Sequence, residues 1–204
     1  MANLIETPRL LLRPFERDDA VAAHAWFGDP VVMRYAPSGP DASVGVTRER
    51  LGRYEAHQAR HGFSKWLVFE RASGQAIGDA GLLVLEGDAR PERWRRGSDD
   101  DGAGPLGEAA RDGESSRESW IDLGFRFQRR SWRKGYATEV GAAWVSVAFG
   151  SLGVDRLNAF VHPDNIPSMK VLERLGFRED GPDQVQGMPA VCFTLRRRGQ
   201  LRKL

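Results

Sequence analysis

The sequence is poor in the features that mark secreted, metal-binding and membrane proteins. Its single cysteine, Cys192, cannot form a disulfide within the chain, and no cluster of cysteine and histidine has the spacing of a zinc site. No stretch approaches roughly 18 consecutive apolar residues, and the first residues lack the basic segment and apolar run of a signal peptide. We therefore expect a protein without a bound metal that stays in the reducing cytoplasm and does not enter a membrane.

A strong excess of either charge is also lacking. Lysine and arginine number 30 and aspartate and glutamate 28, which leaves a formal net charge of +2. The composition therefore gives no reason to expect a strong nucleic-acid-binding surface. The basic excess is local and falls at the end of the chain, where we interpret residues 197–204 as a solvated basic tail. Contact of this tail with nucleic acid, or with an acidic partner such as the ribosome, is the alternative.

Patterns of apolar residues predict one α/β domain over residues 1–204, because the chain is long enough for one substantial core and 41% of it is hydrophobic. Strands are expected at 9–15, 63–70, 76–85, 119–127, 156–161, 178–185 and 190–196. Helices are expected at 18–27, 41–61, 135–150 and 165–175. The stretch 28–40 is expected to be a loop. This order of elements describes a mixed sheet with helices on its faces.

One segment breaks the pattern. From Glu86 to Arg117, glycine, serine, aspartate, glutamate and arginine dominate, and Trp94 and Leu106 are nearly the only large apolar residues. Such a composition cannot bury enough apolar surface to stay folded by itself. We therefore expect residues 86–117 to be a flexible insertion within the domain.

A short segment has the residues of a phosphate-binding loop. It runs from Trp132 to Glu139, contains Gly135, and lies between an expected strand and an expected helix. Glycine permits positive φ, so consecutive backbone amides can converge on an anion at the positive end of the helix. The segment matches neither a Walker A loop nor a Rossmann fingerprint. It indicates a phosphate-bearing ligand, although a single glycine at such a turn more often marks only a turn.

Four segments, in the right order, resemble the GCN5-related N-acetyltransferase (GNAT) family. They are the opening Glu6–Leu10 with Leu12–Pro14, then Ile121–Phe125, Gly135–Glu139 and Val161–Phe177. The ribosomal-protein N-terminal (alanine) acetyltransferases are the branch that the sequence resembles most. The resemblance covers nearly the whole chain except the insertion. It implies a single-domain GNAT fold, with a mixed, mostly antiparallel sheet flanked by helices and interrupted by a long inserted loop.

The resemblance also implies where acetyl-CoA binds as cosubstrate. The family's pyrophosphate signature, Gln/Arg-x-x-Gly-x-Gly/Ala, falls on Trp132, Gly135 and Ala137, and Trp132 departs from it. Backbone amides would hold the pyrophosphate, with a possible contact from the Arg133 cation. The implied loop residues are Arg133, Lys134, Gly135, Tyr136, Ala137 and Thr138. In this family the strand before the loop splays from its neighbour and pairs with pantetheine, which here implies the backbone of Phe125, Arg126 and Phe127.

Three residues follow as candidates for catalysis. By resemblance, Asn165 would hydrogen-bond the pantetheine arm, and Ser168 would protonate the departing thiolate. The alternative for Ser168 is a residue of the first helical turn that satisfies a backbone donor. His162 ends a strand beside the site and titrates in the useful range, so it is a candidate base. Its alternative, a turn histidine hydrogen-bonded to backbone, is the commoner arrangement.

The carboxylates offer no clearer base. Asp122 and Glu118 share one face of the strand that enters the site, and we interpret both as ordinary solvated charges. Glu139 falls in the first turn of a helix, where a carboxylate complements the helix dipole, so we assign it a structural role. A water relay to a modest carboxylate could suffice, so the sequence implies no single base.

The sequence therefore predicts an N-acetyltransferase that transfers acetyl from acetyl-CoA to a primary amine by direct attack. The acceptor could be a protein N-terminus, as the nearest branch suggests, or a small amine, because the stretch Trp26–Arg60, from which this fold builds its acceptor pocket, has no readable specificity pattern. The alternative is a non-catalytic CoA-binding or ribosome-associated module. The family leaves room for a homodimer.

Overall fold

A computed structural model describes residues 4–86 and 120–197 of the chain. The expected insertion, apart from Glu86, and the expected basic tail, apart from Arg197, lie outside the described residues. Among the residues described, no helix is both long enough and apolar enough to cross a membrane.

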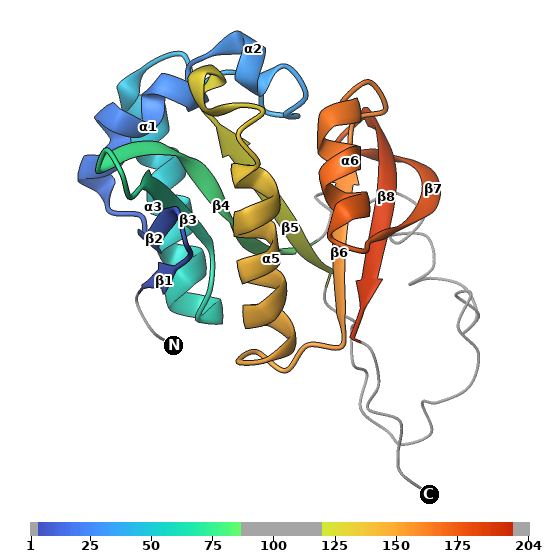
Figure 1. The fold of residues 1–204 in the computed structure, drawn as a ribbon. Helices are drawn as coiled ribbons and strands as arrows, with labels where there is room; N and C mark the ends of the chain where they lie inside the picture. The colour runs from blue at the N-terminus through green and yellow to red at the C-terminus, as the bar shows by residue number, and fades with distance from the viewer. Residues whose placement is uncertain (1–3, 87–119, 198–204) are drawn as a thin grey trace, which may run out of the picture.

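One eight-stranded sheet forms the centre of the fold (Figure 1). Its spatial order is β1-β2-β3-β4-β5-β6-β8-β7, and every neighbouring pair is antiparallel except β5 and β6. The strands are β1 Ile5–Glu6, β2 Leu10–Pro14, β3 Lys65–Glu70, β4 Gln75–Leu85, β5 Trp120–Phe127, β6 Arg156–Val161, β7 Arg178–Val185 and β8 Met188–Arg196. The predicted mixed, mostly antiparallel sheet is confirmed.

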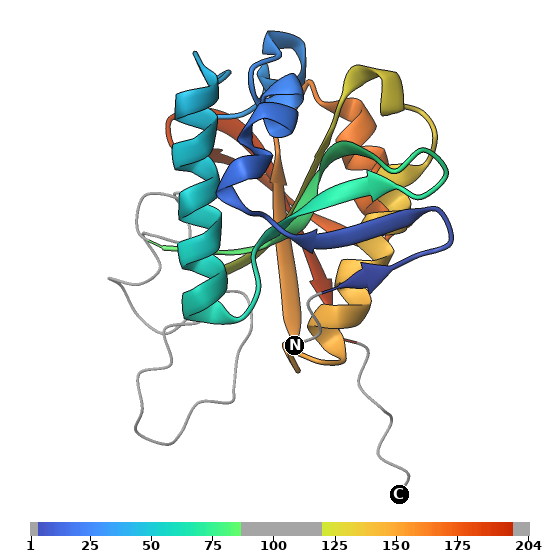
Figure 2. The same cartoon turned by 90° about the vertical axis from the view of Figure 1, so that its left-hand side faces the viewer.

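Helices cover both faces of this sheet. They are η1 Arg17–Asp19, α1 Ala20–Phe27, α2 Pro30–Met33, α3 Val44–His61, η3 Arg129–Ser131, α5 Tyr136–Phe149 and α6 Ile166–Arg174. Helices α5 and α6 lie on one face, and α1 and α3 lie on the other, as the two views show (Figures 1 and 2). The single domain of α/β class is therefore also confirmed.

Each face has its own apolar core. Under α5, Trp144 packs edge-on against Trp66 with ring centroids 5.2 Å apart. Under α1 and α3, Trp26 and Leu51 are fully buried, and Tyr54 stacks on Phe15 at 5.8 Å. Burial of each large apolar side chain contributes about 1.5–3 kcal/mol, so both layers hold their helices firmly against the sheet.

Local signals explain most helix ends. The Ser43 side chain accepts a hydrogen bond from the Val46 amide at the start of α3, and Gly62 ends that helix at φ 77°. The expected loop at 28–40 was wrong in part, because it contains the four-residue α2. Asp29 caps that helix by accepting from the Val31 amide, and Pro30 supplies its first turn. The two-residue β1, paired with β2, was not predicted.

Candidate active site

The central feature of the site is an opening between β5 and β6. Strand β5 pairs with β4 along its whole length, from Trp120 to Phe127. In the described part of the chain it pairs with β6 at one register position only, Asp122 with Asn158. The two strands then diverge toward the turn that leads to α5 (Figure 1). Backbone groups on this edge of β5 therefore have no neighbouring strand and can pair with an extended ligand.

The Trp132 side chain lies at the end of the opening where β5 ends. The indole Nε1 of Trp132 donates to the Phe127 carbonyl oxygen over 2.7 Å. Trp132 is the position at which the sequence departs from the pyrophosphate signature, and this hydrogen bond gives it a structural role at the end of β5. The free backbone edge thus runs from Leu123 to the beginning of Phe127.

The predicted phosphate loop lies where α5 begins. Gly135 adopts φ 80° and Arg133 adopts φ 61°, both in the left-handed region. The first backbone bond of the helix runs from the Glu139 amide to the Gly135 carbonyl. The three amides before it, at 136, 137 and 138, therefore have no carbonyl within the helix and point out of its positive end. This geometry fits an anionic group such as a pyrophosphate.

Two side chains of the loop, Tyr136 and Lys134, help to hold it in place. The Tyr136 hydroxyl donates to Glu70 over 2.5 Å, and the Lys134 ammonium lies 3.7 Å from the same carboxylate. The Arg9 guanidinium donates to the Lys134 carbonyl and stacks over the Tyr136 ring. The loop is thereby fixed to β3 and to the residue that precedes β2, and its backbone remains available for binding.

Glu139 completes this anchor, as its expected structural role requires. Its carboxylate accepts from the Thr7 hydroxyl at 2.6 Å, from the Arg9 amide at 2.9 Å and from Arg9 Nε at 2.7 Å. Burial acts to raise the pKa of Glu139, but these hydrogen bonds outweigh it and lower that pKa. The N-terminal segment is therefore tied to the first turn of α5.

Asn165 and Ser168 lie together at the start of α6. The Asn165 side-chain oxygen caps the helix by accepting from the Ser168 amide at 3.4 Å. The Asn165 amide group keeps its donors for another partner. The Ser168 hydroxyl is distinct from the amide that joins the cap, so its predicted role as an acid is compatible with this geometry.

His162 has the geometry of a turn histidine. Its ring stacks on Tyr35 with centroids 4.9 Å apart, and its Nδ1 accepts a hydrogen bond from the Asp164 amide at 3.2 Å. The Tyr35 hydroxyl donates to the Asp164 carbonyl. These contacts join the loop after α2 to the loop after β6. The Nδ1 lone pair is already used, so the arrangement favours the structural alternative for His162.

Asp122 was interpreted wrongly as a solvated charge. Its side chain is directed to the face that α1 and α3 cover, and the residue is only 8% exposed. Burial raises the pKa of Asp122 to about 6, and the positive charge of Lys65 limits that rise. One carboxylate oxygen, Oδ1, has no hydrogen-bond partner among the described residues. Glu118, the other carboxylate considered, lies outside them.

A buried set of charges surrounds Asp122, and the sequence did not reveal it. Arg126 donates to Asp79 at 3.3 Å and to the Tyr54 hydroxyl at 3.4 Å. Trp26 Nε1 donates to the other oxygen of Asp79 at 2.9 Å. The Arg126 side chain is thus used inside the protein, and only its backbone can meet the pantetheine. The sequence offered one signal, Asp79, which is a charged residue within the apolar run of β4.

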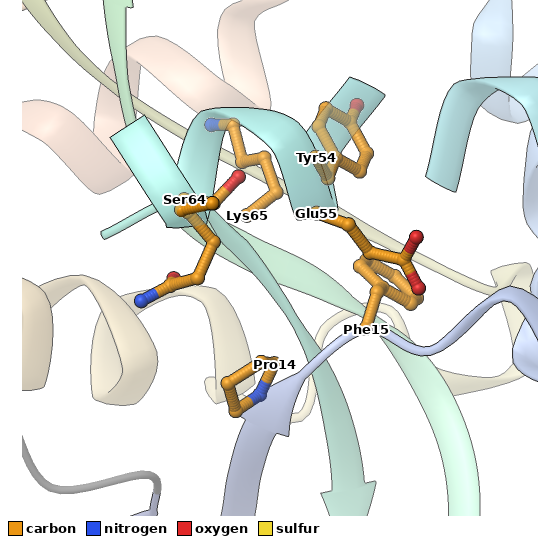
Figure 3. Close-up of a pocket in the computed structure, with 8 residues that line it drawn as sticks. Pro14, Phe15, Tyr54, Glu55, Ser64 and Lys65 are labelled. Carbon is orange, nitrogen blue, oxygen red and sulfur yellow. The ribbon is translucent and has the colours of Figure 1, made fainter. Parts of the chain in front are cut away.

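A cavity of about 200 Å³ lies between α3 and the adjoining ends of β2 and β3 (Figure 3). It is lined by Pro14, Phe15, Tyr54, Glu55, Gln58, Ala59, Ser64 and Lys65. None of these residues belongs to the phosphate loop or to the start of α6. In Figure 3 the Lys65 ammonium points away from Pro14, and it donates to the Gly81 carbonyl at 3.0 Å.

A strand opening beside a helix start that fits an anion is suited to an extended, phosphate-bearing cosubstrate such as a coenzyme A thioester, and comparisons with known proteins show the family. A model of the acetyltransferase (GNAT) domain matches residues 9–178. The chain therefore belongs to the GNAT acetyltransferase family. It is an N-acetyltransferase that uses acetyl-CoA as its cosubstrate and an amine as acceptor.

Individual relatives agree with this assignment. The chain is 29% identical over 175 residues to an uncharacterized N-acetyltransferase, p20, of Bacillus licheniformis. The matched region covers 86% of this chain and 82% of that protein. Two solved structures with coenzyme A share the fold. The aminoglycoside acetyltransferase AAC(6')-Ib has a TM-score of 0.67 at 17% identity, with 92% of this chain and 95% of that chain covered. RimL, a ribosomal L7/L12 α-N-protein acetyltransferase, has a TM-score of 0.66 at 14% identity, with 95% and 97% covered.

Proposed function

We propose that this enzyme acetylates a primary amine at the opening between β5 and β6, and that Asp122 accepts the proton of the amine. The observation that carries the proposal is the position of Asp122. It occupies the register position after which β5 and β6 diverge, and its buried Oδ1 lacks a partner among the described residues. The Phe160 backbone donates to this carboxylate, but an oxygen buried without a partner costs stability, and a functional role explains why such a group is retained.

The transfer needs few protein groups. The amine nitrogen attacks the thioester carbonyl carbon, so that a C–N bond forms, the C–S bond breaks and the thiol leaves. The nitrogen loses one proton, which Asp122 accepts, and the departing sulfur gains one, which the Ser168 hydroxyl donates and regains from solvent. A base with a pKa near 6 is ionised at neutral pH and close enough to it for efficient proton transfer.

The cofactor arrangement follows from the same geometry. The pyrophosphate would rest on the amides from Arg133 to Thr138, and the pantetheine arm would run along the free backbone edge of Phe125 and Arg126, within reach of the Asn165 amide. This placement brings the thioester to the narrow end of the opening, where Asp122 lies.

For the acceptor, the modest basicity of Asp122 favours a protein or peptide N-terminus. An α-amino group has a pKa of about 8, whereas an alkyl amine has a pKa near 10. At neutral pH the N-terminal amine is therefore neutral far more often, and a carboxylate with a pKa near 6 can support its deprotonation more readily. The resemblance to the ribosomal-protein branch supports the same choice. A small amine, such as an aminoglycoside or polyamine, is the alternative class.

A panel of acceptors tests the proposal. The purified protein is given acetyl-CoA with short peptides that have free N-termini, the same peptides blocked at the N-terminus, a polyamine and an aminoglycoside. Release of CoA thiol is followed, and products are located by mass spectrometry. Turnover with free peptides and none with blocked peptides is expected. Turnover confined to the small amines would change the acceptor class, and no thiol release from any amine would contradict the proposed reaction.

A further inference from the structure

The strand face under α1 and α3 carries a second charged residue that the reaction scheme above does not use. Lys65 opens β3, is only 3% exposed, and donates to the Gly81 carbonyl of β4. Its ammonium fills the space beside Gly124 that a Cβ would occupy, and Asp122 Oδ2 lies 3.6 Å from that same position. The Lys65 and Asp122 charges thus lie around one residue of β5, at the strand opening.

We propose that Lys65 is a positioning residue for acetyl transfer, whose buried ammonium keeps the Asp122 carboxylate ionised and therefore able to accept the amine proton. The inference rests on the proposed function of Asp122. Two features make Lys65 the charge on which Asp122 depends. A lysine side chain is rarely buried without a partner, and the absence of a side chain at Gly124 leaves room for the ammonium beside β5.

The other charged groups around this point are already engaged. Asp79 of β4 is paired with Arg126 of β5 and accepts from Trp26 of α1. Arg126 acts on Asp122 in the same direction as Lys65, but more weakly. From α3, the Tyr54 hydroxyl contacts Arg126.

Helix α3 contributes further titratable groups. Arg50, whose charge acts on Arg126, is paired with Asp41, and Glu55, which lines the same cavity as Lys65, is paired with Arg17. His57 bonds to the Phe63 carbonyl and the Val84 amide, and the Lys65 charge lowers its pKa. Asp79 and Arg126 are thus paired with one another. Of the charges that favour ionised Asp122, Lys65 acts most strongly, and a hydrogen bond from the Phe160 backbone acts in the same direction.

The electrostatic consequences agree with this geometry. Burial lowers the pKa of Lys65 to about 8, and the Asp122 charge opposes that decrease. Conversely, burial raises the pKa of Asp122, and Lys65 is the largest factor that opposes the increase. Without the ammonium, less would counteract the effect of burial, so the pKa of Asp122 would rise further.

The test measures the ionisation of Asp122 directly and through catalysis. The protein is labelled with aspartate carrying ¹³C in its carboxyl group, and the Asp122 resonance is identified by its loss in Asp122→Asn. Its titration is followed in the wild type, in Lys65→Met and in Lys65→Gln. The pH dependence of kcat is measured for the same proteins. Lys65→Gln keeps a donor for the Gly81 carbonyl but removes the charge.

Both Lys65 variants are expected to raise the titration midpoint of Asp122, and the acidic inflection of kcat, by about one pH unit or more. A matched control, Arg17→Met, removes an exposed cation that pairs with Glu55 on α3, and it should leave both midpoints unchanged. A Lys65→Gln protein with wild-type midpoints would overturn the proposal, because Lys65 would then act only through its hydrogen bond.

A failure of the inference about Lys65 can be distinguished from a failure of the proposed role of Asp122. If the resonance of Asp122 shifts in both variants while kcat in the wild type shows no inflection at that midpoint, Lys65 controls the carboxylate but Asp122 is not the base. If the resonance does not shift, the inference about Lys65 is wrong whatever the activity shows. Circular dichroism at each pH establishes that the compared proteins are folded.

Discussion

Gly135 is the residue on which the phosphate loop most depends. At φ 80°, a residue with a Cβ is strained by about 1–2 kcal/mol, and its Cβ would meet the Arg9 guanidinium at 3.4 Å. We therefore expect Gly135→Ala to weaken acetyl-CoA binding about tenfold, measured as KM and by calorimetry with CoA. Gly153→Ala is the matched control, because Gly153 has φ 65° in open space between α5 and β6. Equal effects of the two changes would show that strain alone, rather than ligand binding, is measured.

Ser168 contributes through its hydroxyl if it protonates the thiolate. A thiol has a pKa near 8.5, so its thiolate leaves readily without a proton. Ser168→Ala is therefore expected to lower kcat only about tenfold, and to leave the KM for acetyl-CoA and the melting temperature unchanged. The melting temperature should hold because the helix cap uses the Ser168 amide. Ser146→Ala, at an exposed site on α5, is the control. A wild-type kcat for Ser168→Ala would remove the residue from the mechanism.

At the scale of elements, a histidine side chain of α3 bonds to the part of β4 that lies beyond its pairing with β3. Beyond the start of β3, the edge of β4 faces α3, and His57 Nε2 accepts from the Val84 amide at 2.9 Å. Its Nδ1 lies 2.8 Å from the Phe63 carbonyl and donates to it. The bond from the Val84 amide requires a neutral Nε2, whereas the bond to the Phe63 carbonyl holds for either form of the ring. Burial lowers the pKa of His57, and the Phe63 hydrogen bond opposes that decrease. Helix α3 is therefore coupled to the sheet by a group that titrates.

The sign of the pH effect follows from that lowered pKa. The unfolded chain binds the proton more readily than the folded one, so the contribution of His57 to stability is present above pH 6.5 and is lost as pH falls from there through the folded pKa. His57→Leu should cost about 1 kcal/mol at pH 7 and should make the free energy of unfolding less dependent on pH between 7 and 5, measured by urea denaturation. His61→Gln removes a neighbouring charge that also lowers the pKa of His57, but it leaves both His57 hydrogen bonds in place, so it should keep most of the wild-type dependence. The same steep dependence in His57→Leu would contradict this account.

At the scale of the whole molecule, the parts that local residues determine were predictable. Gly62 and Ser43 mark the ends of α3, and a glycine between a strand and a helix indicated the turn with positive φ from which α5 begins. Short elements such as β1 and α2 escaped because two to four residues show no periodicity. The sheet and its domain class followed from longer apolar patterns.

The parts that depend on distant segments were not predictable. Period-2 alternation placed Asp122 on a strand face, but α1 and α3, which bury that face, come from residues 20–61. The sequence therefore gave no sign that the carboxylate is buried, that Lys65 lies beside it, or that the pairing of β5 with β6 ends there. The stacking of His162 on Tyr35 could not be predicted for the same reason, because Tyr35 lies on a distant loop.

The most direct test of the account is the pH dependence of kcat for the wild type and Asp122→Asn, at saturating acetyl-CoA and acceptor. Burial raises the pKa of Asp122 to about 6, so the wild-type rate should decrease about tenfold for each pH unit below that value. Asp122→Asn should lower kcat about 100-fold at pH 7.5, lose the inflection near pH 6 and keep the KM for acetyl-CoA. A variant that retains the wild-type kcat and the same inflection would contradict the assignment of Asp122 as the base.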